Sequence, residues 1–109
     1  MILNKELKEA LKLLVNNEFI KAHDLFEGLW REYKDDKKTR EESFILKAFV
    51  NASISFELYK MNRIEHSINV WNTYKKYEDL IDSLISPNRD TYKELKKIIY
   101  LKREEFIKW

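Results

Sequence analysis

The sequence predicts an all-α protein: a single compact bundle of about five helices, with antiparallel neighbours and a central, apolar third helix. Two observations favour this fold class. Only one glycine and one proline occur in 109 residues, whereas sheets with tight hairpins use many such turn residues. Apolar residues also recur three and four positions apart along most of the chain, which is the spacing of one face of a helix. Residues 1–109 are therefore expected to form one helical-bundle domain.

The first two helices are predicted at residues 4–15 and 18–33. In the first, leucines repeat at helical spacing until Asn16 and Asn17 interrupt the pattern. In the second, the apolar face carries several aromatic side chains. The charged residues 34–38 then predict a solvated loop.

The third helix is predicted at residues 39–60. Thr39 and Glu42 fit a capping box, in which the threonine hydroxyl accepts a hydrogen bond from a free backbone amide and the glutamate reaches back. Beyond its first turn the helix is apolar almost all round, which is typical of a buried central helix. Asn51 and Glu57 stand out as its interior polar residues.

The last two helices are predicted at residues 62–85 and 90–106. Asn62 is a candidate cap for the fourth helix, and Ser86 followed by Pro87 is a typical start for the fifth. No segment shows the alternating pattern of a strand, so no strand is assigned.

A weak internal repeat links two of these helix starts. Residues 17–26 and 62–71 share the frame Asn-x-apolar-x-x-small-x-x-x-aromatic, with Ala22 and Ser67 as the small residues. A small side chain there lets a neighbouring helix approach closely, as in tetratricopeptide helices, whose repeat is about 34 residues long. We expect two related helix pairs within one bundle; a tetratricopeptide-like interaction module is the alternative.

The most informative motif is HDLFEGLW at residues 23–30. It places His23, Glu27 and Trp30 at positions i, i+4 and i+7 of one helix, where side chains lie over one another. His23 falls within the apolar face. Such a histidine is either a core residue whose ring pairs with a carboxylate, or a ligand-binding or acid–base group. Together with Asn51, these three are the candidate ligand-binding residues.

Catalytic templates remain incomplete, so we assign no catalytic residue, no metal site and no cofactor. The absence of cysteine excludes disulfides, thiol nucleophiles and thiolate metal sites. A zincin motif needs a second histidine, a di-iron bundle needs Glu-x-x-His, and a phosphate loop needs several glycines. The other histidine, His66, falls off the apolar face and is expected at the surface.

The amino-acid composition limits the classes of molecule that we expect this protein to bind. The net charge of +2 arises from 21 basic and 19 acidic residues, which argues against nucleic acid. No apolar run approaches the roughly 20 residues of a membrane span, and the first residues lack a signal-peptide layout, so we expect a cytoplasmic protein. The apolar ending at residues 106–109 suggests a docking segment, and a homodimer is the expected assembly.

The helix-two motif, with Asn17, Ala22 and Arg31 around it, resembles the signature His-Glu-x-x-Glu-x-x-Trp of domain of unknown function 309, a family of small all-helical proteins. The resemblance extends over about residues 7–85. It implies a compact helical bundle with a polar cluster between its second and third helices, and Asn51 stands where the family has a glutamine. A family histidine late in the third helix has no counterpart here, because Glu57 and its neighbour occupy that place.

Three functional hypotheses follow. The first is a binding or scaffold domain in which the His23, Glu27 and Trp30 cluster mainly serves the structure. The second is a small-ligand site, or a hydrolase-like enzyme, that uses His23 and Glu27 between the second and third helices. The third is a protein-interaction module. The incomplete catalytic templates favour a protein that is not an enzyme over one that is.

Overall fold

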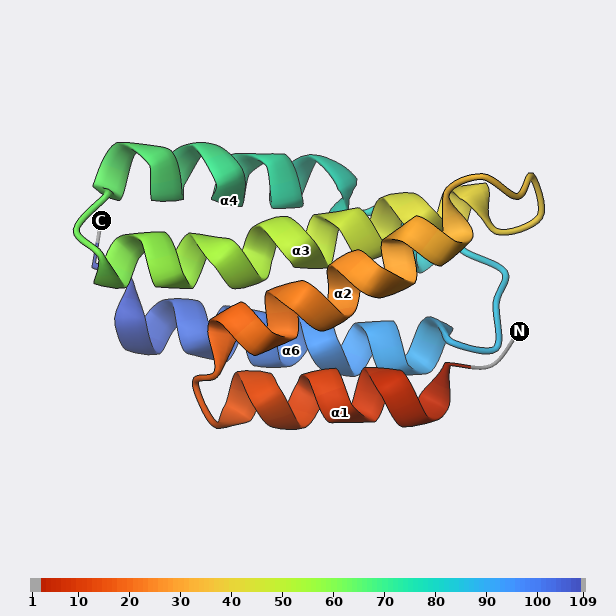
Figure 1. Cartoon of the computed structure of the whole chain (residues 1–109), viewed down its shortest axis with the longest axis horizontal. Helices are drawn as coiled ribbons and strands as arrows, with labels where there is room; N and C mark the ends of the chain where they lie inside the picture. Colours follow the sequence, from red (N-terminus) through yellow and green to blue (C-terminus); the bar gives the residue numbers. More distant parts are fainter. Residues whose placement is uncertain (1–2, 109) are drawn as a thin grey trace.

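The fold is described for residues 3–108 of a computed structural model, shown in Figure 1. All its regular secondary structure within those residues is helical, which confirms the predicted fold class. The elements are α1 (Asn4–Val15), α2 (Phe19–Tyr33), α3 (Arg40–Lys60), α4 (Ile64–Glu78), α5 (Leu80–Ser83) and α6 (Arg89–Phe106). The long helices give a molecule of 38 × 23 × 22 Å.

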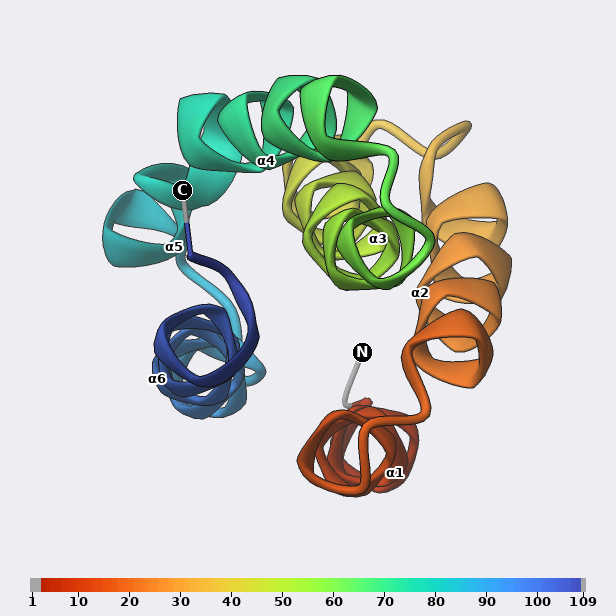
Figure 2. The ribbon, with the colours of Figure 1, turned by 90° about the vertical axis from the view of Figure 1, so that its left-hand side faces the viewer.

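Helix α3 lies at the centre of the bundle, as predicted. It packs most extensively against α2 and α4, whereas α1 packs against α2 and α6. Figure 2 looks along the helices and shows α3 on the inside of an arc formed by the others. Twelve of its 21 residues are buried, which explains why its sequence is apolar on nearly every side. The consecutive helices α1 to α4 are antiparallel, and α6 runs in the same direction as α1 (Figure 1).

An aromatic cluster around Phe49 forms the middle of the core. The ring of this α3 residue stacks on Phe26 of α2, with 5.2 Å between ring centroids. It also contacts Tyr92 of α6 at 5.9 Å and Tyr74 of α4 at 6.0 Å. All four side chains are fully buried, so one residue of the central helix joins three surrounding helices.

The internal repeat corresponds to two turns of the same geometry. Asn17 and Asn62 both adopt a left-handed backbone, with φ of 63° and 61°. After each asparagine, the next amide donates to the carbonyl five residues earlier at 2.9 Å, which closes a Schellman motif at the ends of α1 and α3. The small residues Ala22 and Ser67 are fully buried in the helices that follow. The two helix pairs expected from the sequence are therefore present.

All three predicted N-terminal caps are wrong. At the last helix, Ser86 accepts a hydrogen bond from the amide of Asn88 at 3.0 Å, but α6 itself begins only at Arg89. Thr39 precedes α3 without making a side-chain cap bond, and its hydroxyl instead donates to the carbonyl of Tyr33 at 2.8 Å. That carbonyl ends α2 and would otherwise lack a partner, so the threonine ties the loop to the helix before it. Glu42 does not reach back to Thr39, because it is buried against α6. Asn62 ends α3 rather than capping α4, whose preceding residue is Arg63.

The helix predicted at residues 62–85 is divided. Helix α4 ends at Glu78, and the short α5 follows after Asp79. The bend allows Ile81 and Leu84 to reach the core, where they are 1% and 5% exposed. Burial of these two side chains favours the break, although no glycine or proline marks it.

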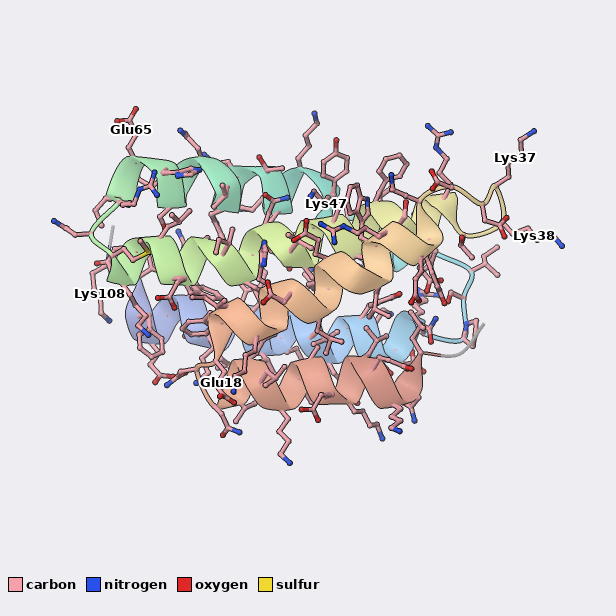
Figure 3. The ribbon with its side chains drawn as sticks, in the orientation of Figure 1. Glu18, Lys37, Lys38, Lys47, Glu65 and Lys108 are labelled. Carbon is pink, nitrogen blue, oxygen red and sulfur yellow. The ribbon has the colours of Figure 1, made fainter. Side chains whose placement is uncertain are left out.

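The end of the described chain packs on the bundle itself. Ile107 is buried, Phe106 meets Phe19 edge to face at 5.7 Å, and the amide of Lys108 donates to the Tyr59 hydroxyl at 3.2 Å. Trp109, the last residue of the predicted docking segment, lies outside the described residues. Charged side chains such as Lys37 and Lys38 project from the loop between α2 and α3 (Figure 3). None of the described helices combines the length and apolar character needed to cross a membrane.

Candidate functional site

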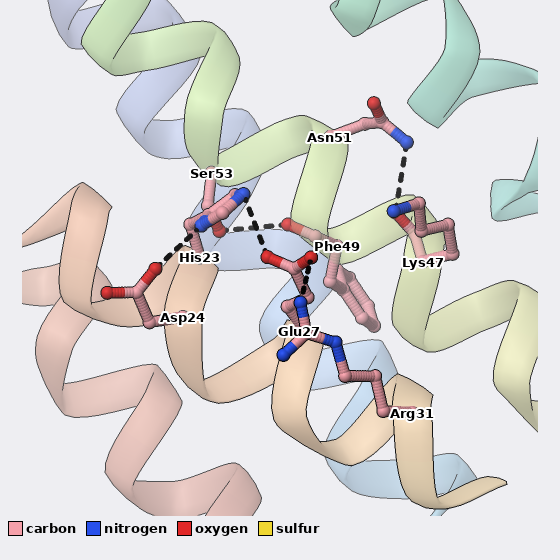
Figure 4. A network of polar contacts seen from close by, with 8 residues as sticks. All are labelled: His23, Asp24, Glu27, Arg31, Lys47, Phe49, Asn51 and Ser53. Atoms are coloured by element: carbon pink, nitrogen blue, oxygen red, sulfur yellow. Dashed lines mark hydrogen bonds and ion pairs between the residues drawn. The ribbon is translucent and has the colours of Figure 1, made fainter.

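The residues singled out on α2 form a continuous polar stripe, shown in Figure 4. The His23 Nδ1 atom lies 2.9 Å from a carboxylate oxygen of Asp24, and its Nε2 atom lies 3.6 Å from Glu27. Arg31 donates to the other oxygen of Glu27 at 3.1 Å. The side chains of His23 and Glu27 are 23% and 26% exposed, so the stripe lies at the border between core and solvent. His23 and Glu27 are thus brought together as the helical spacing predicts.

Trp30 extends the stripe toward α3. Its ring lies beneath the ammonium group of Lys47 from α3, 4.2 Å from the ring centroid, and Lys34 approaches the same ring at 5.3 Å. The indole is partly buried against the hydrophobic core. A cation over the face of a tryptophan is an attractive contact, so this pair links α2 to α3.

Asn51 lies on α3 at the same level of the bundle but makes a different contact. Its amide donates to the carbonyl of Lys47, one turn earlier in its own helix, at 3.0 Å. In Figure 4 the amide points toward Lys47 rather than toward His23 or Glu27. Glu57 pairs with Lys60 at 3.7 Å. The contacts of both residues therefore lie within α3.

The stripe also has the composition of a divalent-cation site. His23, Asp24 and Glu27 each offer one ligand atom, and these atoms lie within 4.8 Å of one another. Imidazole nitrogen with two carboxylate oxygens suits Zn²⁺ and similar transition metals. All three ligands come from one helix, so a bound ion would keep open positions facing the solvent.

An acidic hollow adjoins the stripe between α1 and α2. It has a volume of about 380 Å³, and Asp24 lines it together with Glu6 and Glu32. Gly28 also lines it, and nothing lies within 4 Å of the position that its Cβ would occupy. The hollow therefore presents carboxylates on the side of Asp24 that faces away from α3.

The structure reveals a buried carboxylate that sequence reasoning misassigned. Glu42 is 8% exposed and accepts hydrogen bonds from the amide of Asn88 at 2.8 Å and from the Tyr92 hydroxyl at 2.6 Å. Asn88 in turn accepts a hydrogen bond from the backbone amide of Leu3 at 2.8 Å. This network joins α3 to α6 and to the start of α1. The only signal in the sequence is the helical spacing of Glu42 with the apolar Ile45.

The surroundings of the Glu42 network raise the pKa values of two tyrosines, Tyr33 and Tyr92. Burial, and next the Glu42 carboxylate, raise the pKa of Tyr33 to about 12. Burial and the hydrogen bond to Glu42 raise the pKa of Tyr92 far above its usual value. Both phenols therefore stay neutral in the folded protein at any ordinary pH.

A second buried carboxylate occupies the other side of the bundle. Glu78, at the end of α4, is 8% exposed and accepts the Tyr100 hydroxyl at 2.7 and 2.8 Å. Burial and the nearby Glu78 raise the pKa of Tyr74 as well. Arg103 of α6 lies 4.9 Å from the centroid of the Trp71 ring. These contacts join α4 to α6 much as the Glu42 network joins α3 to α6.

Comparison with known proteins confirms the family resemblance. The model of a domain of unknown function, DUF309, matches residues 7–70, which is more than half of the chain. The matched segment begins in α1 and ends within α4, and it contains the α2 stripe, Asn51 and Glu42. Helices α5 and α6 lie outside it. No curated protein and no solved structure matches the chain.

Proposed function

This chain belongs to the DUF309 family, and we propose that it is a small cytoplasmic binding or scaffold domain. In this proposal the α2 stripe mainly stabilises the packing of α2 on α3. The contact that carries the proposal is the one between Trp30 and Lys47, because it joins the stripe to the central helix at 4.2 Å. Glu27 has partners on both sides in His23 and Arg31, so the polar groups of the stripe serve one another.

The repeated helix pairs support the scaffold part of the proposal. Two pairs with the same left-handed asparagine turn lie side by side, α1 with α2 and α3 with α4. Stacked helix pairs present extended surfaces to partner proteins. We expect a homodimer as the assembly, since twofold pairing is the commonest association of soluble proteins. Sedimentation equilibrium over a wide concentration range would return the mass of one chain if this expectation is wrong.

The structural role of the stripe is tested by His23→Ala. We expect the free energy of unfolding to fall by about 1 kcal/mol, because a half-buried side chain and a contact of Glu27 are lost. Urea unfolding followed by circular dichroism measures this change. His66→Ala is the matched control, since His66 is an exposed histidine on α4 and its loss should leave stability unchanged. An unchanged stability of the His23 variant would refute the structural role.

A second candidate function is divalent-cation binding at His23, Asp24 and Glu27, favoured by the close approach of their ligand atoms. A bound ion of this kind could activate water, and His23 would then act in a hydrolase-like site. Titration with Zn²⁺, monitored through the NMR signals of the His23 ring, tests it. Saturable shifts that vanish in Glu27→Gln but persist in Glu57→Gln would support a metal site. Equal shifts at His23 and His66 would indicate only weak surface binding.

A further inference from the structure

A hollow of about 620 Å³ lies along α6 beside α5, far from the α2 stripe in the sequence and outside the segment that matches the family. Its lining comes from one face of α6 and one residue of α5: Asp82, Lys93, Lys96, Lys97, Tyr100, Leu101 and Glu104. This volume is within the range of sites for small molecules, roughly 300–1,000 Å³. The hollow is thus large enough for a ligand.

Two residues give the hollow its apolar surface. One is Leu101, whose side chain is 58% exposed. Tyr100 beside it is held by its hydroxyl, which donates to both oxygens of the buried Glu78. The phenol ring therefore lines the hollow in a defined position, and covering it with Leu101 would remove apolar surface from water.

One end of the lining carries a cluster of cations. Lys93, Lys96 and Lys97 lie within five residues on the first half of α6. Of the two carboxylates, Glu104 lies at the opposite end of the same helix face and Asp82 lies on α5. Lys93 is thus about two turns of helix away from Tyr100 and Leu101, and Lys96 and Lys97 are about one turn away. From Lys93 to Leu101 the helix rises about 12 Å.

We propose that this hollow binds a small amphipathic anion, an aliphatic carboxylate whose head group meets the three lysines and whose chain covers Tyr100 and Leu101. The separation of charge and apolar surface along α6 carries the assignment. A carboxylate gains from several ammonium groups at once, while Glu104 disfavours a second anionic group at the far end. This site is independent of the role proposed for the α2 stripe.

Titration of the isotope-labelled full chain with sodium decanoate below its micelle concentration tests the proposal by NMR. We expect saturable shifts of the amides of α6 and of Asp82. Acetate has the same head group without the chain, and decyltrimethylammonium has the same chain with a cationic head, so both should bind much more weakly. Equal binding of the cationic detergent would overturn the assignment of an anion, and shifts confined to other helices would overturn the assignment of the site.

Matched variants distinguish binding in this hollow from nonspecific binding elsewhere on the protein. Leu101→Ser should weaken decanoate binding about fivefold or more through lost apolar contact, and Lys97→Glu should weaken it to a similar degree. Val15→Ser and Lys75→Glu change an exposed apolar residue and an exposed lysine elsewhere, so they should bind as the unmodified chain does. If Leu101→Ser, shown to be folded by circular dichroism, binds decanoate normally, the proposal is wrong.

Discussion

The Glu42 carboxylate accepts hydrogen bonds from Tyr92 of α6 and from Asn88 just before that helix, and Asn88 also accepts a hydrogen bond from the backbone of Leu3. A buried acceptor with two donors is costly to remove, because both donors lose this hydrogen bond in a place shielded from water. The position of this single side chain therefore affects three segments of the bundle. Its loss should be felt far more strongly than the loss of its exposed neighbour Glu41.

We accordingly expect Glu42→Ala to lower the free energy of unfolding by about 2–4 kcal/mol. Glu42→Gln should cost less, since it keeps one acceptor oxygen. Urea unfolding of both variants, with Glu41→Ala as the control within about 0.5 kcal/mol of the unmodified chain, measures the difference. A Glu42→Ala variant as stable as the control would mean that the network contributes nothing to folding.

The two left-handed asparagines make a second prediction at this scale. A residue with a β-carbon pays roughly 1 kcal/mol to adopt the left-handed backbone conformation. Asparagine tolerates this conformation better than most residues, and glycine adopts it without this cost because it has no β-carbon. Asn62→Gly should leave stability unchanged or raise it slightly, whereas Asn62→Ala should lower it by about 1 kcal/mol. The same pair of changes at Asn17 should behave alike, because φ is 63° there and 61° at Asn62. If the alanine variant at either turn unfolds at a higher temperature than the glycine variant, the backbone there is not left-handed.

At the scale of helices, most of the fold could be predicted from the sequence, and the reasons are local. The end of α1 is marked by Asn16 and Asn17, and the central place of α3 follows from its apolar surface. The break at Asp79 could not be predicted, because it depends on Ile81 and Leu84 reaching a core built by other helices. The stripe of His23 and Glu27 was predictable because both lie on one helix.

Sites that join distant segments could not be predicted from the sequence either, because they also depend on contacts with other helices. The partners of Glu42 lie 46 and 50 residues away, so its pattern alone is that of an ordinary first-turn glutamate. Asn51 shows a contact of the other kind: its amide donates to the carbonyl of Lys47, one turn earlier in its own helix. Helical spacing predicts neighbours on one helix, whereas contacts between helices depend on packing angles that it does not contain.

The small residues of the repeat make a prediction about helix packing. Ser67 of α4 is fully buried, and its hydroxyl donates to the carbonyl of Ser55 in α3 at 2.7 Å. Ser67→Ala should cost about 1 kcal/mol for the lost hydrogen bond, and Ser67→Leu at least about 2–3 kcal/mol because the helices must separate. Asn69→Leu, an exposed change on the same helix, is the control for thermal unfolding. If the leucine variants at both positions melt alike, α3 and α4 do not approach closely at Ser67.

For the whole molecule, four tyrosines set the response to alkaline pH. The pKa of Tyr33 is raised to about 12, and those of Tyr74, Tyr92 and Tyr100 are raised as well, mainly by burial. In the unfolded chain they would ionise near the ordinary value of about 10. The folded state therefore holds protons that the unfolded state releases, so stability is fully present below pH 10 and falls as the pH rises toward 12 and beyond. Unfolding free energies measured across this range should decline steadily.

Substitution of Tyr33 allows the effect of tyrosine ionisation on stability at high pH to be separated from the effect of packing. Within residues 3–108 its hydroxyl is buried and has no hydrogen-bond partner, unlike that of Tyr92. Tyr33→Phe should therefore leave stability at neutral pH unchanged or slightly raised, while making the decline above pH 10 shallower. Tyr92→Phe should instead lower stability at neutral pH, because the Glu42 carboxylate loses a donor. If the Tyr33→Phe variant is less stable by more than about 1 kcal/mol at neutral pH, the Tyr33 hydroxyl makes a stabilising hydrogen bond and the prediction is wrong.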